Sequence, residues 1–194
     1  MDIIINNQTD LANFYKHLRK YKSLKNKEIY KLKKTKNISQ NDIFELEYVI
    51  NALNIKNEYD RLKYVYDAYC KCLDKYYIET NICEFDKNGL CRAQRDHKTK
   101  TNINGCCGSC KYCSKQGCTI KCITCKIMFC KYIKKVKEVP NPHDIKIYKY
   151  FFTLPQKLIS EESFWTEENE VIKSLYKANI FTWLFNKNKK MKRY

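Results

Sequence analysis

Eight cysteines lie in one 25-residue run of this chain, and no other feature restricts its fold as strongly. The run has the pattern Cys106-Cys107-x2-Cys110-x2-Cys113-x4-Cys118-x3-Cys122-x2-Cys125-x4-Cys130. Cysteines at C-x2-C spacing can bend round one cation, because the turn between them directs both sulfurs the same way. The run therefore predicts a metal site, and it identifies the chemistry more firmly than the biological role.

The chain is long enough for one ordinary domain with a small appended module. We expect a mainly α fold, in which amphipathic helices pack around a small irregular, metal-stapled Cys-rich insert with short hairpins. Its parts are a helical region at 1–80, the Cys-rich module at 81–130 and a second helical region at 131–194, within one compact domain.

The helices before the cysteines are predicted from the spacing of apolar residues. Apolar residues at three- and four-residue steps predict one amphipathic helix over residues 9–34. Ser39 and Asp42 form a capping box before a second helix. A third helix is expected over about residues 58–77.

The helices after the cysteines follow from similar patterns. Helical spacing resumes over 124–136 and ends before Pro140. Asn141-Pro142 predicts the start of a helix through Phe152, although residues 145–147 alternate as a strand would. Thr166, followed by acidic residues, predicts a closing helix that could extend to Trp183-Leu184.

Four cysteines outside the main run fall into two kinds. Asn88-Gly89 is a strong hairpin pattern, so two short strands could bring Cys83 and Cys91 together. Cys70 and Cys72 lie two apart on a predicted helix and point in different directions. We therefore interpret these two as buried thiols rather than as ligands of one metal.

The main run contains a CxxC…CxxC pair with the reach of a zinc ribbon or treble clef, formed by residues 110–113 and 122–125. The other cysteines of residues 83–130 are enough for a second four-thiolate site. His97 or His143 could replace a thiolate, but a single His in a Lys-rich loop is more often only a surface residue.

Zinc is not the only metal that the pattern allows. Residues 107–118 come within one residue of the ferredoxin run C-x2-C-x2-C-x3-C, so an iron–sulfur cluster is the alternative. The fourth ligand is displaced and no proline follows it, which favours zinc. Reduced cysteines packed as small hydrophobes are disfavoured, because the surrounding residues are mostly polar.

Several short motifs carry a resemblance: Asn81-Ile-Cys-Glu-Phe-Asp-Lys-Asn-Gly-Leu-Cys91, Gly105-Cys-Cys-x2-Cys110-Lys-Tyr, Gly117-Cys-Thr, Thr124-Cys-Lys126 and Cys130-Lys-Tyr132. With them the chain resembles uncharacterised cysteine-cluster proteins of low-GC, clostridia-like bacteria, over roughly residues 69–173. The resemblance implies no established activity. The ligands that it implies are Cys83, Cys91, Cys106, Cys107, Cys110, Cys118, Cys125 and Cys130. Cys113 and Cys122 fall where the pattern allows other residues, and eight thiolates suit two tetrahedral zinc ions.

The chain carries a formal net charge of +17, which favours a polyanionic partner, and nucleic acid is the commonest one. Lys greatly outnumbers Arg, so we expect contacts to the phosphate backbone more than base readout. The densest positive stretch supplies the predicted contact residues Lys16, Arg19, Lys20, Lys22, Lys27, Lys31, Lys33 and Lys34. The alternative is that these lysines only form the solvent-exposed faces of helices and bind no partner.

The same sequence disfavours several classes of protein. It starts without a basic and apolar leader and has no apolar run that could span a bilayer, so we expect a cytoplasmic protein with reduced cysteines. No Walker loop, H-E-x-x-H or deaminase signature occurs, and no small-molecule substrate is indicated. Glu84, Asp86 and Asp96 lie near the cysteines, but carboxylates in polar turns are usually solvated.

Three functions remain. The preferred one is a structural-zinc protein that contacts DNA or RNA phosphates or acts as a regulator. The alternatives are an iron–sulfur redox or electron-transfer protein and a zinc-stabilised module that binds another polypeptide.

Overall fold

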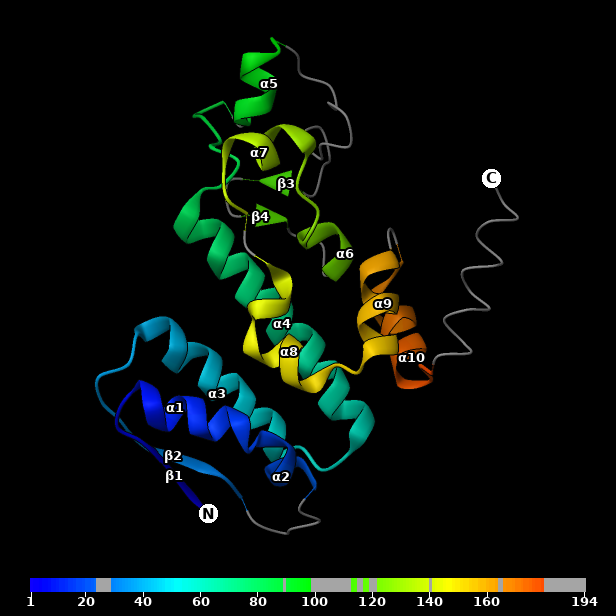
Figure 1. The fold of residues 1–194 in the computed structure, drawn as a ribbon. Helices are drawn as coiled ribbons and strands as arrows, with labels where there is room; N and C mark the ends of the chain where they lie inside the picture. Colours follow the sequence, from blue (N-terminus) through cyan, green and yellow to red (C-terminus); the bar gives the residue numbers. More distant parts are fainter. Residues whose placement is uncertain are drawn as a thin grey trace.

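The computed structural model describes residues 1–23, 29–88, 90–98, 113–114, 117–118, 122–139, 141–163 and 166–179. This part of the chain is mainly helical, as predicted, and Figure 1 shows its arrangement. The elements are β1 (Asp2–Ile5), α1 (Gln8–Lys16), α2 (Leu18–Ser23), β2 (Lys31–Thr35), α3 (Gln40–Asn54), α4 (Glu58–Thr80), α5 (Arg92–Asp96), β3 (Cys113–Ser114), β4 (Gly117–Cys118), α6 (Ile123–Lys126), α7 (Lys131–Val136), the 3₁₀ helix η1 (Pro142–Asp144), α8 (Lys146–Phe151), α9 (Leu154–Glu162) and α10 (Glu168–Tyr176).

The long helix α4 runs through the molecule and organises the other elements. Helices α3, α8 and α10 pack against it, and α5, α7 and the β3–β4 pair lie around its C-terminal end (Figure 1). Asn57 caps its first turn by accepting a hydrogen bond from the Asp60 backbone N–H at 3.0 Å. Its C-cap is Asn81, whose left-handed φ of 41° turns the chain into the loop that carries the first candidate ligand.

The second and third predicted helices are confirmed as α3 and α4. Ser39 is the N-cap of α3, and its hydroxyl accepts the backbone N–H of Asp42 at 3.0 Å. Cys70 and Cys72 lie within α4 and are buried, as interpreted from the sequence. Burial raises the pKa of Cys72 to about 12 and raises that of Cys70 as well, so both remain neutral thiols.

The prediction of one helix over residues 9–34 is wrong. Helix α1 ends at Lys16, α2 follows as a separate short helix, and β2 pairs with β1 as a parallel strand. The pairing buries Ile3 and Ile5. Burial alternates over residues 29–32, as in a strand, whereas the three-residue step from Ile29 to Leu32 also fits a helix. Only the pairing with the distant β1 decides between the two.

The later helices are divided more finely than predicted. The helix expected over 124–136 is split into α6 and α7, and the one expected from Asn141 becomes η1 followed by α8, so the strand alternative at 145–147 is wrong. Helix α9 was not predicted, although Thr153 and Gln156 form a capping box at its start. Helix α10 ends at Tyr176, and Trp183-Leu184 lies outside the described residues.

Two groups of buried apolar side chains hold these elements together. The main core joins α1, α3, α4, α8, α9 and α10. At its centre Tyr69 and Tyr148 stack with ring centroids 4.3 Å apart, an arrangement worth about 0.5–1.5 kcal/mol beyond area burial. A separate small cluster, called here the cysteine-side core, comprises Ile82, Cys91, Ala93, Phe129, Cys130 and Ile133.

A search for membrane spans finds no candidate among the described residues, because none of the helices there combines the required length with sufficient apolar character.

Candidate metal centre

The loop after α4 is shaped by one carboxylate. Asp86 Oδ1 accepts the backbone N–H groups of Asn88 at 2.8 Å and of Leu90 at 2.9 Å, and the Asp86 N–H donates to the Leu90 carbonyl at 3.0 Å. An Asp side chain that bonds the backbone two residues on forms an Asx turn. The predicted β-hairpin is therefore wrong in its described part, where a side-chain-bonded turn replaces two strands.

The turn nevertheless brings the two ends of the loop together, as the sequence predicted for Cys83 and Cys91. The backbone N–H of Arg92 donates to the Cys83 carbonyl at 2.9 Å. Cys91 is the N-cap of α5, and its N–H donates to the Gln94 side-chain oxygen at 3.0 Å. Cys91 therefore has a fixed backbone position beside Cys83.

Cys130 joins these two residues from a distant part of the sequence. It is the N-cap of α7, and its sulfur accepts the Ile133 backbone N–H at 3.4 Å. Cys91 and Cys130 are buried in the cysteine-side core, and half-buried Cys83 packs against it. Cys130 therefore has a fixed backbone position at the start of α7.

The remaining candidate ligands are described less completely. Cys125 lies in α6 and is half-buried. In the β3–β4 pair, the backbone position of Cys118 is opposite that of Cys113, and β4 contacts both α4 and α6. Cys106, Cys107 and Cys110 lie outside the described residues.

Cys122 has a different environment from that of the candidate ligands. It is fully buried, and its thiol donates to the Ser163 carbonyl at 3.4 Å, beside the end of α9. This contact ties the segment before α6 to the end of α9.

The two histidines considered as ligands have other neighbours. His97 is exposed, and its ring lies edge-on to Tyr132 at 5.5 Å between centroids. His143 Nε2 lies 3.2 Å from a carboxylate oxygen of Glu161. The first contact places His97 beside Tyr132, which packs against the cysteine-side core, whereas the second places His143 beside α9.

Within the part of the chain that the structure describes, no group of three or more His, Cys, Asp or Glu side chains is arranged to hold a metal ion. Cys83, Cys91 and Cys130 are thus gathered around one core without forming a complete site among themselves. Any complete site requires side chains from the part of the run that is not described.

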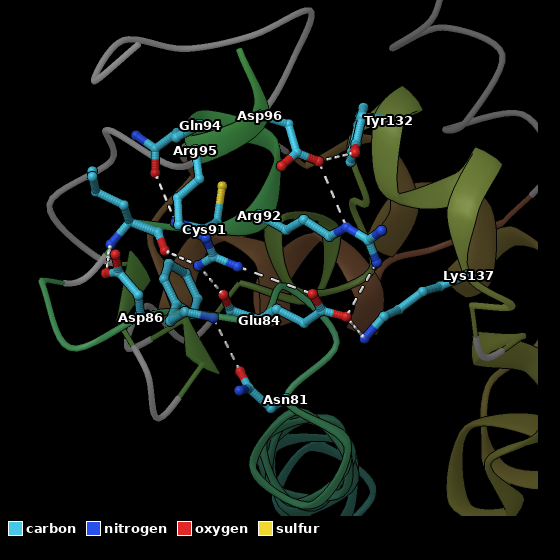
Figure 2. A network of polar contacts seen from close by, with 12 residues as sticks. Asn81, Glu84, Asp86, Cys91, Arg92, Gln94, Arg95, Asp96, Tyr132 and Lys137 are labelled. Carbon is cyan, nitrogen blue, oxygen red and sulfur yellow. Dashed lines mark hydrogen bonds and ion pairs between the residues drawn. The ribbon is translucent and has the colours of Figure 1, made fainter. Parts of the chain in front are cut away.

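A polar network fastens the elements around these cysteines, as Figure 2 shows. Glu84 Oε1 lies 2.6 Å from Lys137 Nζ and 3.4 Å from Arg92 Nη1, and Glu84 Oε2 lies 4.0 Å from Arg95 Nη2. The hydrogen bond from Lys137 is the main reason that the pKa of Glu84 is below its usual value. The network links the loop after α4 to α5 and to the end of α7.

The expectation that the carboxylates near the cysteines are only solvated is therefore wrong for Glu84 and Asp86, whereas Asp96 is exposed as expected and also has protein partners. Asp96 accepts a hydrogen bond from the Tyr132 hydroxyl and lies 3.6 Å from Arg92 Nε. Lys137 and Tyr132, the partners of Glu84 and Asp96 from α7 and its end, are distant in sequence. The partners of Asp86 lie in its own turn, and Arg92 lies one helical turn from Asp96. Glu84 directly follows the candidate ligand Cys83, and this is the one sequence feature that could have indicated its ion pairs with Lys137 and Arg92.

A second contact missed from the sequence anchors α6 to α4. The Lys126 side chain is only 1% exposed and forms an ion pair with Asp74 of α4. The Tyr77 hydroxyl donates to the Lys126 backbone carbonyl. Because both partners come from α4, they fix the segment that carries Cys125.

The basic residues predicted to contact nucleic acid do not lie on one face of a single helix. Lys16 and Arg19 lie exposed on α1 and α2, while Lys31, also exposed, and Lys33 lie on β2. Lys33 is paired with Asp2 at 2.6 Å. Lys27 and the side chains of Lys20, Lys22 and Lys34 lie outside what the structure describes.

Comparisons of this chain with protein-family models, with curated proteins and with solved structures find no match.

Proposed function

We propose that this chain is a cytoplasmic structural-zinc protein whose basic surface contacts nucleic-acid phosphates. The observation that carries the proposal is the meeting of Cys83, Cys91 and Cys130 at the cysteine-side core. Two of these residues start helices, and the third lies in the loop that precedes α5. Structural metals in small domains are often bound where several chain segments meet, because one cation then fixes all of these segments at once.

The size of the cysteine-side core supports a structural role for the metal. Its buried members other than cysteine are Ile82, Ala93, Phe129 and Ile133. So few apolar side chains bury little surface, whereas structural zinc contributes about 10–16 kcal/mol in zinc-finger peptides. Metal binding is therefore the larger source of stability for this part of the fold.

The proposed ligands are the eight cysteines that the resemblance implies, arranged as two four-thiolate zinc sites. Each site of Zn²⁺ with four thiolates carries a net charge of −2. The formal charge of +17 then falls by four, to about +13, which still attracts phosphate.

Elemental analysis tests the metal part of the proposal. Protein purified without oxygen should contain about two zinc per chain and no absorbance near 400 nm. Iron together with inorganic sulfide would replace the proposal with an iron–sulfur protein. Protein that keeps its full circular dichroism spectrum after complete metal removal would show that no metal organises residues 81–130.

Titration of labelled DNA and RNA tests the nucleic-acid part. Binding to either should weaken steeply between about 50 and 200 mM salt, because each phosphate contact releases counterions. Absent or salt-insensitive binding would contradict it. A specific protein partner retained at high salt would instead support the protein-interaction alternative.

A further inference from the structure

Three lysines lie together on one face of α7. At about 100° per residue, Lys134 and Lys135 are within roughly 60° of Lys131, one on each side. All three are exposed, whereas Ile133, about 200° round the helix from Lys131, is buried in the cysteine-side core. The helix therefore packs through Ile133 and presents what we call the α7 lysine face, Lys131, Lys134 and Lys135, to solvent.

This placement of charge suits the helix only in part. Lys131 is the first residue of α7, where the positive end of the helix dipole disfavours a cation, and the first turn contains no acid. Lys134 and Lys135 are at the i+3 and i+4 positions from Lys131, where like charges repel. Lys134 and Lys135 also lie in the last turn of α7, where the dipole favours a cation, so the dipole penalty falls on Lys131 alone.

Two acidic residues that face α7, Glu84 and Asp96, are engaged by other groups, whereas Glu138 lies exposed just after the helix. Glu84 pairs with Lys137 and Arg92, and Asp96 pairs with Arg92 and Tyr132 (Figure 2). Among the described residues, no ion pair forms with any member of the α7 lysine face. The polar network thus engages Glu84 and Asp96 and leaves these three cations available to a partner.

From this geometry we infer that, among the residues that the structure describes, the α7 lysine face is the principal phosphate-contacting surface for a nucleic-acid strand, an inference that rests on the proposed function. Lys side chains are mobile point charges, which suit successive backbone phosphates rather than the bidentate reading of a base. The N-terminal basic residues compete less well, because they are divided among α1, α2 and β2 and Lys33 already has a partner. Binding is accordingly independent of sequence.

The position of α7 also couples this surface to the metal. Cys130 is the N-cap of α7, so a metal that holds its thiolate fixes the residue from which the helix starts. Removing the metal therefore disorders the lysine face and weakens nucleic-acid binding.

The test compares two triple variants of the full, metal-loaded chain by fluorescence anisotropy with labelled 20-nucleotide DNA and RNA. The first is Lys131→Gln/Lys134→Gln/Lys135→Gln. The second, Lys16→Gln/Arg19→Gln/Lys31→Gln, removes the same charge from exposed residues of the N-terminal part. Both are checked for metal content and circular dichroism before binding is measured.

Loss of three phosphate contacts lowers the slope of log K against log salt by about 2 to 3. Between about 50 and 200 mM salt, the affinity of the unaltered protein should then fall roughly 20- to 40-fold more than that of the α7 variant. The N-terminal variant should change the slope by less than about one. If the triple variant does not fold, Lys134→Gln alone should lower the slope by about 0.7 to 0.9.

An unchanged slope in the α7 variants, with binding intact, overturns the α7 assignment and leaves the proposed function standing. A larger loss in the N-terminal variant than in the α7 variant does the same. If the unaltered protein binds neither DNA nor RNA, both the assignment and the nucleic-acid part of the proposed function are wrong.

Discussion

Truncating Ile133 tests whether the cysteine-side core contributes to stability independently of the metal. The side chain is 1% exposed and is the one fully buried residue of α7 in that core, against which the partly buried Tyr132 also packs. Ile133→Ala removes three carbon groups, worth about 0.8 kcal/mol each in transfer free energy. With the cavity that remains, we expect a loss of roughly 3 kcal/mol in the free energy of unfolding. Ile133→Val removes one carbon group and should cost about 0.5–1.5 kcal/mol.

Denaturant unfolding at fixed free zinc, followed by far-ultraviolet circular dichroism, measures this loss without a change in metal occupancy. Val136→Ala is the matched control, because Val136 lies on the same helix but is exposed. That variant should stay within about 0.5 kcal/mol of the unaltered protein. An equal and small effect of Ile133→Ala and Val136→Ala would refute the packing of α7 through Ile133.

Three further predictions concern the main core and its helices. Burial raises the pKa of Glu45, whose carboxylate accepts the Lys146 N–H at 2.7 Å, so the folded state holds this proton more tightly than the unfolded chain. The free energy of unfolding should therefore fall as the pH rises from the unfolded to the folded pKa of Glu45. Glu45→Gln should remove that fall when thermal melts are compared between about pH 4 and pH 8, and parallel profiles for the two proteins would count against it. Ser39→Ala should cost about 1 kcal/mol in chemical denaturation, because the first turn of α3 loses its cap, and Ser39→Asp should restore most of it; no loss would contradict the cap. Cys70 and Cys72 should resist alkylation in the native protein, since burial raises both pKa values, and peptide mass mapping that finds them labelled before unfolding would disprove their burial.

The success of the sequence analysis depended on how local the determining contacts are. Helices α3 and α4 could be predicted because the Ser39 cap of α3 and the apolar spacing of both helices are local patterns. Strand β2 could not, because its pairing with β1 joins parts of the chain on either side of α1 and α2. Local patterns are ambiguous wherever a short apolar run fits two periods.

The candidate site shows the same division. The approach of Cys83 to Cys91 followed from a turn pattern in the sequence, although the turn is made by the Asp86 side chain. The arrival of Cys130 at the same core, and the pairing of Glu84 with Lys137, depend on how α7 packs. The spacing of cysteines along the sequence does not predict such tertiary contacts.

The choice of ligands is the central claim, and zinc stoichiometry of two double variants tests it most directly. Cys113→Ser/Cys122→Ser alters the two cysteines placed outside the ligand set, and we predict that it keeps about two zinc per chain. Cys91→Ser/Cys130→Ser alters two proposed ligands at the cysteine-side core, and it should bind fewer than two. Loss of zinc from the first variant, or full retention of zinc by the second, would contradict the account.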